Sequence, residues 1–260
     1  DTVEWIYDHE PQTDAQKAAV RDAVAKAYLP RLEALGYQRR AGESADDVLM
    51  RNSLASTLGL EFKVPAVRAA LLQQGEAALK PGKDGLPDLM AANPDLLRTA
   101  LSVAVEEQGK AAVDELVAAI PKTTDPVRRN AMLGALSHAQ GAQADVVRDF
   151  ALSPQVKVGE MAMILRGGRD TVAQRDGLWN WFTAHYDKIA ARTGVFSGGY
   201  LPRLAAGGGC SDAEAQRVQA YFKPKLGQGA GMKRGLAQTH EEIVLCSALK
   251  AHQNPASISQ

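Results

Sequence analysis

Apolar residues recur at helical spacing along almost the whole chain. The first run consists of Val20, Val24, Tyr28, Leu32 and Leu35. Their spacing of three or four positions places them on one face of a helix. The capping box at residues 13–16 (TDAQ) predicts the start of this helix, and Gly36 predicts its end. Pro30 lies inside the run and predicts a kink or a division of the helix.

Caps, prolines and glycines divide the rest of the chain into further helices. Starts are expected at Ser44, Pro65, Asn93, Asp125 and Ser211. Gly59 and Gly75 are expected to end two of these helices, because glycine is common just after a last helical turn. Apolar residues within 113–120 keep the helical spacing up to Pro121, which closes that run.

The overall pattern predicts an all-α fold, since no segment shows strand signals. Short Gly, Pro and Asn connections between helices favour antiparallel pairs stacked into a superhelix that forms a bowl. No strict period is visible, so irregular HEAT- or armadillo-like pairs are expected. We expect one helical domain over residues 1–260, without a boundary at the glycine-rich stretches 198–199, 207–209 and 227–231.

Composition and charge limit the classes of partner. An apolar fraction of 45% is ample for a core. The formal net charge is zero, so no overall field attracts the chain to nucleic acid. No apolar run approaches the roughly 20 residues that span a bilayer, so no membrane partner is expected. The chain begins with Asp1 rather than Met, and we expect it to be a fragment of a longer protein.

The two cysteines, Cys210 and Cys246, leave two alternatives open. A disulfide between them would staple the C-terminal helices and imply an oxidising, extracytoplasmic compartment. Two buried thiols would instead fit a cytoplasmic protein.

Motifs for catalysis are incomplete. Residues 240–244 (HEEIV) resemble a zinc-binding H-E-x-x-H, but Val244 stands where the second histidine is required. We expect a solvated face on a helix that buries Leu236 and Ile243. Residues 227–231 (GQGAG) lack the third glycine of a dinucleotide loop and follow no strand. No catalytic residue and no metal ligand is therefore assigned.

Single titratable groups are interpreted as structural. The histidines are His9, His138, His185, His240 and His252, and none lies one turn from another. A metal-dependent enzyme assembled from them is the weakest alternative, which loss of zinc on dialysis would remove. Glu106 and Glu107 are expected on a solvated helix face.

Two arginines, Arg166 and Arg169, flank a Gly-Gly pair ahead of an aromatic helix. Arginine on a turn between helices suits a peptide carboxylate, because its planar guanidinium can donate two parallel hydrogen bonds. These two residues are the candidate carboxylate contacts. The alternative is that Arg166 caps carbonyls at a helix C-terminus and Arg169 is solvated.

Several segments resemble a known family. Residues 28–37 (YLPRLEALGY) and 41–51 (AGESADDVLMR) are similar to the pattern p-x-l-x-x-l-G-aromatic, then G-E-S-x-x-x-x-x-L-R, in the C-terminal domain of the aminopeptidase N family of zinc metallopeptidases. Residues 125–136, 179–189 and 215–249 resemble later segments of that domain, in the same order. Together the segments cover nearly the whole chain.

The resemblance implies a helical superhelix that caps an upstream catalytic domain and admits peptides to it. The zinc ion and the general base of such enzymes belong to that upstream domain, so the resemblance assigns no cofactor to this chain. Its implied partners are its own upstream catalytic domain and peptide substrates, whose C-terminus can meet positive side chains of the domain. The resemblance does not identify Arg166 or Arg169 as those side chains. The alternative function is a stand-alone helical-repeat scaffold that binds a protein or peptide.

Overall fold

The computed structural model describes Tyr7 and residues 13–83 and 85–252. Within this part of the chain the regular secondary structure is helical, and the β-type pairing found is an isolated bridge between Pro81 and Pro87. The predicted all-α class is confirmed, and the succession of helices is consistent with a superhelical domain. The bowl stays a prediction.

The described part of the chain packs into two compact units, one within residues 1–147 and one within residues 148–252. The boundary falls within one helix and at none of the glycine-rich stretches. The expectation of one domain over the whole chain stays a prediction.

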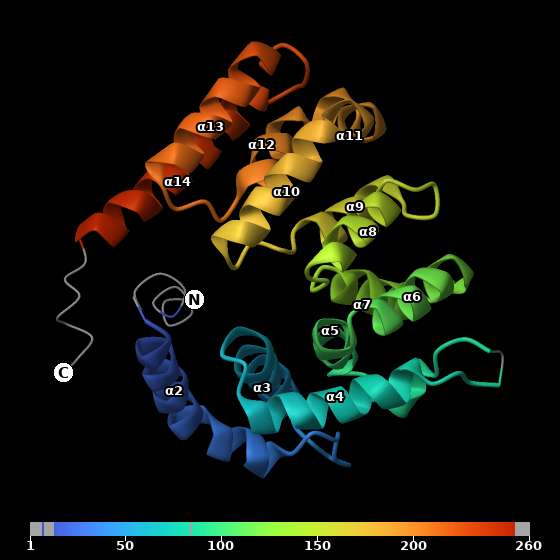
Figure 1. Ribbon diagram of the computed structural model, residues 1–260. Coiled ribbons are helices and arrows are strands. Elements are labelled where there is room, and N and C mark those ends of the chain that lie inside the picture. Colours follow the sequence, from blue (N-terminus) through green and yellow to red (C-terminus); the bar gives the residue numbers. More distant parts are fainter. Residues whose placement is uncertain (1–6, 8–12, 84, 253–260) are drawn as a thin grey trace. The chain divides into compact units, whose positions relative to one another are not determined.

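The first unit contains α2 to α7 and most of α8 (Figure 1). The α-helices are α2 (Asp14–Leu35), α3 (Ala45–Ser56), α4 (Pro65–Leu79), α5 (Leu97–Gln108), α6 (Lys110–Ala119), α7 (Pro126–Leu136) and α8 (Ala142–Ala151). Shorter helical turns are Thr57–Glu61, Leu89–Ala91 and Ile120–Lys122.

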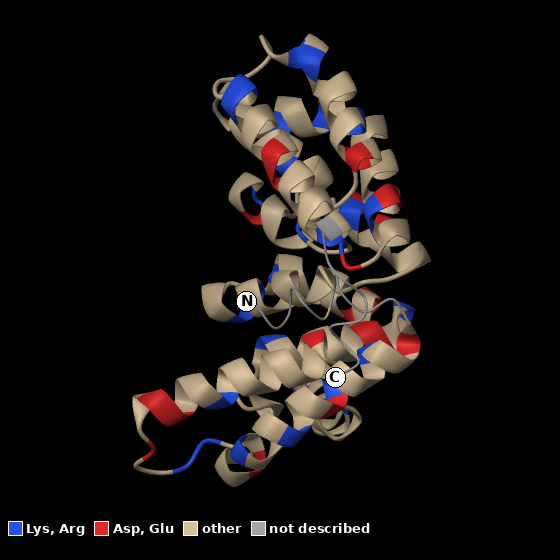
Figure 2. Cartoon of the chain, turned by 90° about the vertical axis from the view of Figure 1, so that its left-hand side faces the viewer, with Lys and Arg blue, Asp and Glu red and all other residues tan. Residues whose placement is uncertain are grey.

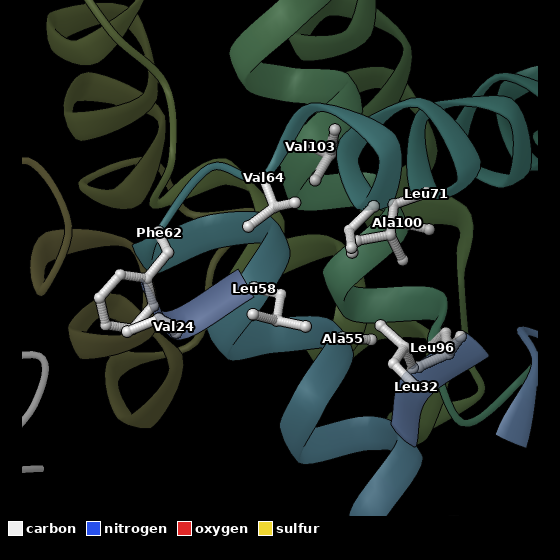
Figure 3. Close-up of a cluster of buried hydrophobic side chains, with 11 residues drawn as sticks. Val24, Leu32, Ala55, Leu58, Phe62, Val64, Leu71, Leu96, Ala100 and Val103 are labelled. Carbon is white, nitrogen blue, oxygen red and sulfur yellow. The ribbon is translucent and has the colours of Figure 1, made fainter. Parts of the chain in front are cut away.

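The core of this unit is built from the apolar stripes of α2 to α5 (Figure 3). Leu32 from α2, Leu58 and Phe62 from the α3–α4 connection, Leu71 from α4 and Leu96 ahead of α5 are all essentially inaccessible to solvent. Burial of such side chains is worth about 1.5–3 kcal/mol each. The helical periodicity of the sequence therefore becomes one contiguous hydrophobic cluster.

The predicted helix starts are confirmed at most positions. Thr13 forms a capping box with Gln16, the Ser44 side chain accepts the Asp47 amide, and Pro65 occupies the first turn of α4. Helix α2 continues through Pro30, so the proline does not divide it. The start at Asn93 is wrong by a few residues, because Asn93 Oδ1 binds the Asp95 amide in a separate turn and α5 begins at Leu97.

Two predicted helix ends, Gly59 and Gly75, are wrong. Gly59 lies inside a π-helical turn (Thr57–Glu61), and α4 continues past Gly75 to Leu79. A Cβ on Gly59 would overlap the Leu71 side chain, and one on Gly75 would overlap Ala100 O. These glycines permit close approach of neighbouring segments, which local sequence patterns do not reveal.

The second unit contains α9 to α14 (Figure 1). The α-helices are α9 (Val158–Leu165), α10 (Val172–Ala184), α11 (Tyr186–Thr193), α12 (Leu201–Ala206), α13 (Asp212–Phe222) and α14 (Met232–His252). Shorter helical turns are Val195–Tyr200 and Lys223–Lys225.

The glycine-rich stretch 227–231 has a packing role in this unit. The Gly199 amide donates to Ala230 O at 2.9 Å, and the Ala230 amide donates to Val195 O at 2.7 Å. A Cβ on Gly198 would lie 2.6 Å from Gly229. The stretch is therefore one side of a contact between two backbones, which only glycine allows.

Acidic and basic residues are interspersed on the described helices in the view of Figure 2. This mixture agrees with the formal net charge of zero. In the described part of the chain, no helix combines the length and the apolarity needed to cross a membrane.

Candidate functional site

The two candidate arginines lie on the connection between α9 and α10. Arg166 is the C-terminal cap residue of α9, and Gly168 turns the chain with a φ of 71°. Thr171 then forms a capping box with Gln174 and begins α10. The turn is thus defined at both ends by helix termini.

The side chain of Arg169 points into the unit. Its Nη2 donates to Leu165 O at 3.2 Å and to Leu204 O at 2.7 Å, and its Nη1 donates to Arg203 O at 3.1 Å. The guanidinium therefore caps the carbonyl ends of both α9 and α12, as cations near helix C-termini do. Both Nη atoms already have acceptors, and Arg169 presents no free edge to a ligand.

Burial, together with the nearby positive charges of Arg166, Arg203 and Arg148, lowers the pKa of Arg169 to about 10, although Tyr200 opposes this shift. At neutral pH the group is still positively charged. Arg169 therefore contributes positive potential to the turn without contacting solvent freely.

Arg166, unlike Arg169, is exposed and contacts a side chain rather than backbone carbonyls. Its Nε donates to the Tyr200 hydroxyl at 2.7 Å, and its guanidinium carbon lies 5.6 Å from the centre of the Tyr200 ring. Among the described residues, none forms a hydrogen bond or an ion pair with its two Nη atoms. This free edge has the geometry that a carboxylate requires for two parallel hydrogen bonds.

The alternative drawn from the sequence was that Arg166 caps helix carbonyls and Arg169 is solvated, and the structure shows the two roles exchanged. Arg169, expected to be solvated, caps helix carbonyls, and Arg166, expected to cap, is the exposed group. Of the two candidate arginines, Arg166 is the exposed one, and its contact with a carboxylate stays a prediction. Tyr200, 34 positions away, was missed because no local pattern links it to Arg166.

The turn is also linked to Glu214 at the start of α13. Glu214 is 8% exposed and accepts the Arg175 Nε at 2.8 Å, while Arg175 Nη1 donates to Arg169 O at 3.1 Å. Burial by itself raises the pKa of Glu214, but hydrogen bonds from Arg175, the Cys210 amide and Ser211 hold it below its usual value. The sequence indicated only a helix start at Ser211, three residues before this carboxylate.

Cys210 and Cys246 are joined in a disulfide that links the α12–α13 loop to α14. The structure therefore contains the disulfide rather than two free thiols, and the compartment stays a prediction. Cys210 and Cys246 are both partly exposed.

The incomplete zinc motif lies on the surface of α14. Leu236 and Ile243 are buried as predicted, while Glu241 and Glu242 are exposed and Glu242 Oε2 lies 3.4 Å from Arg203 Nε. In the part of the chain that the structure describes, no group of three or more His, Cys, Asp or Glu residues could hold a metal ion. His9 and the side chain of His252 lie outside that part.

Glu106, expected on a solvated face, instead has a side chain that is only 6% exposed. Its carboxylate lies 2.8 Å from Arg68 Nη1, 3.2 Å from His138 Nδ1 and 3.4 Å from Lys63 Nζ. Burial by itself raises the pKa of Glu106, but the hydrogen bond to His138 and the charges of Lys63 and Arg68 lower it below its usual value. Glu107, its neighbour, pairs with Arg68 from the exposed side. This cluster is an internal ion network of the first unit.

The fold is that of an all-helical domain, and comparison with known families identifies it further. The profile of the ERAP1-like C-terminal domain matches residues 1–245, and the chain belongs to this family. The resemblance to the C-terminal domain of the aminopeptidase N family is thereby confirmed. No curated protein matches the chain.

Proposed function

We propose that this chain is the non-catalytic C-terminal domain of a zinc-dependent aminopeptidase, which caps the active site and helps to admit and orient peptide substrates. Family membership supports attachment to an upstream catalytic domain. The zinc ion and the hydrolytic groups would belong to that domain. The Cys210–Cys246 disulfide favours an extracytoplasmic location.

One observation carries the peptide-handling part of the proposal, namely the free guanidinium edge of Arg166. Tyr200 fixes the Nε side of the guanidinium and leaves both Nη atoms toward solvent. Arg169 adds positive charge from beneath the turn. A peptide carries one free carboxylate at the end opposite to the amine that an aminopeptidase processes. Arg166 is therefore suited to bind the C-terminus of a peptide whose N-terminus lies in the catalytic domain.

The test uses the natural full-length protein and peptide pairs that differ only in a free or an amidated C-terminus. Replacing Arg166 by Ala should raise KM for the free acid about tenfold, because a charge-assisted hydrogen bond is lost. KM for the amide should stay unchanged. Arg203→Ala is the matched control, since it removes an exposed neighbouring arginine that pairs with Glu242. Equal effects on acid and amide would contradict the assignment of Arg166.

The enzyme assignment itself is tested by the mass and the zinc content of the protein isolated from its source. A polypeptide several hundred residues longer, with about one zinc per chain, is expected for an aminopeptidase with a separate catalytic domain. A metal-free polypeptide close to 27.7 kDa would support the stand-alone scaffold, which family membership does not favour.

A further inference from the structure

We propose that the Cys210–Cys246 disulfide, acting through Glu214 and α12, holds the Arg166 turn in its binding geometry, so that reduction of the disulfide loosens the turn. The proposal deepens the proposed function, because it adds a redox control to the same peptide contact. Two separate connections lead from the disulfide to the turn.

The first connection passes through the carboxylate of Glu214. Its Oε2 accepts the Cys210 amide at 2.9 Å and the Ser211 hydroxyl at 2.7 Å. Its Oε1 accepts Arg175 Nε, and Arg175 holds the backbone carbonyl of Arg169. The backbone of the disulfide loop and the backbone of the turn are therefore joined by one buried acid and one arginine.

The second connection passes through α12. Arg169 binds the carbonyls of Arg203 and Leu204 near the end of this helix, and the disulfide loop follows directly. A Cβ on Gly207 would overlap Arg169 Nη1, and Gly208 packs on the Arg169 side chain with a φ of 85°. The turn and the loop are thus in direct contact.

The loop between these connections depends on the disulfide for its order. Residues 207–209 are three consecutive glycines, which have the largest conformational freedom of any residue in the absence of a constraint. Cys246 ties the end of this loop to α14 across a separation of 36 residues. With the bond broken, the Cys210 amide is no longer fixed against Glu214, and the glycines can leave Arg169.

The chemistry is a two-electron reduction by a dithiol. The dithiol donates two electrons and two protons, the Sγ–Sγ bond breaks, Cys210 and Cys246 become thiols, and the dithiol becomes a disulfide. Partial exposure of both cysteines gives such a reductant access. Reoxidation restores the bond and the turn.

Hydrogen–deuterium exchange of the full chain tests the proposal without any ligand. In the reduced protein, amide exchange in residues 166–170 and 203–210 should rise about tenfold, as for a local opening. Residues 152–156 are the internal control, because Arg192 caps the carbonyls of Leu152, Ser153 and Val156 independently of the disulfide. Their exchange should not change.

A second variant separates local loosening from general destabilisation. Glu214→Gln keeps the disulfide but weakens the link to Arg175, so exchange in residues 166–170 should rise in the oxidised protein. Reduction of this variant should then raise exchange in residues 166–170 by a smaller factor than in the unaltered chain, because the substitution and the reduction both act on the connection through Glu214. Cys210→Ser with Cys246→Ser should reproduce the reduced protein under oxidising conditions.

Two results would overturn the proposal. One is unchanged exchange in residues 166–170 on reduction, and the other is an equal rise in residues 152–156, which would make the disulfide a staple of the whole unit. If Arg166→Ala left KM for the free-acid peptide unchanged, the assignment of a peptide carboxylate to Arg166 would be wrong. The exchange result does not depend on that assignment, because no peptide is present. The two failures are therefore distinguishable.

Discussion

The guanidinium of Arg51 is fully buried and paired with the carboxylate of Glu43. Arg51 Nη1 lies 2.9 Å from Glu43 Oε2, and Arg51 also donates to the carbonyls of Gly36 at 2.9 Å and Leu35 at 3.3 Å. The pair closes the connection between α2 and α3. Glu43 and Arg51 are the two charged residues that the G-E-S…R pattern of the aminopeptidase N family specifies in this segment. That motif is therefore structural, because its acid and base satisfy each other and the end of α2.

Arg51→Lys should destabilise the first unit. Lysine lacks the planar fork, so the carbonyls of Leu35 and Gly36 lose donors. The free energy of unfolding should fall by about 2 kcal/mol or more. Arg31→Lys is the matched control, because Arg31 forms an exposed pair with Asp47 across the same two helices. Its effect in urea unfolding should stay within about 0.5 kcal/mol, and equal effects of the two changes would contradict the argument.

Glu106→Gln should change how stability depends on pH. The pKa of Glu106 is lowered in the folded chain, so its ionised form stabilises the protein above the unfolded pKa of about 4.3 and loses this effect as pH falls through the folded pKa. At pH 7 the variant should be less stable by about 2 kcal/mol. The difference should shrink below about pH 4.

Urea unfolding between about pH 3 and pH 7 measures this difference. Glu107→Gln is the control, since Glu107 pairs with the same Arg68 but is 44% exposed. A Glu106 effect that persists undiminished at pH 3 would show that the carboxylate charge is not the cause.

Gly235→Ala should destabilise the second unit, since the new Cβ would overlap the Gly199 carbonyl. Backbone atoms cannot move aside as a flexible side chain can, and overpacking of this kind costs about 1–3 kcal/mol. Gly159→Ala is the control, because a Cβ there meets nothing within 4 Å and Gly159 lies in α9. That variant should be neutral or stabilised by up to about 1 kcal/mol, measured by thermal unfolding. Equal effects would mean that the Gly199 contact is not close.

Arg169→Lys and Arg166→Lys should separate a structural arginine from an exposed one. The Arg169 change leaves the carbonyls of Leu165 and Leu204 without their donors, and stability should fall by about 2 kcal/mol. The Arg166 change should alter stability by less than about 0.5 kcal/mol. Chemical denaturation monitored by tryptophan fluorescence measures both. A larger loss for Arg166 would contradict the placement of the two side chains.

The sequence supports the local features of the candidate site but not its geometry. Arg166 and Arg169 were identified from a turn signal, yet which of them is exposed depends on α12 and Tyr200, far along the chain. Glu106 was misjudged for the same reason, since its polar partners come from α4 and from the segments before α4 and after α7.

The sequence by itself determined the all-α class, most helix starts and the family. The class and the helix starts follow from interactions within a few residues: caps satisfy nearby amides, and apolar spacing defines one helical face. The family follows from the order of several motifs along the chain. Only the tertiary structure decided that Gly59 and Gly75 are contact points and that Cys210 pairs with Cys246. It also decided that Arg169 is internal while Arg166 is free. These outcomes depend on contacts between residues that are far apart in the sequence. Such contacts are set by side-chain packing, which produces no repeating pattern in the sequence.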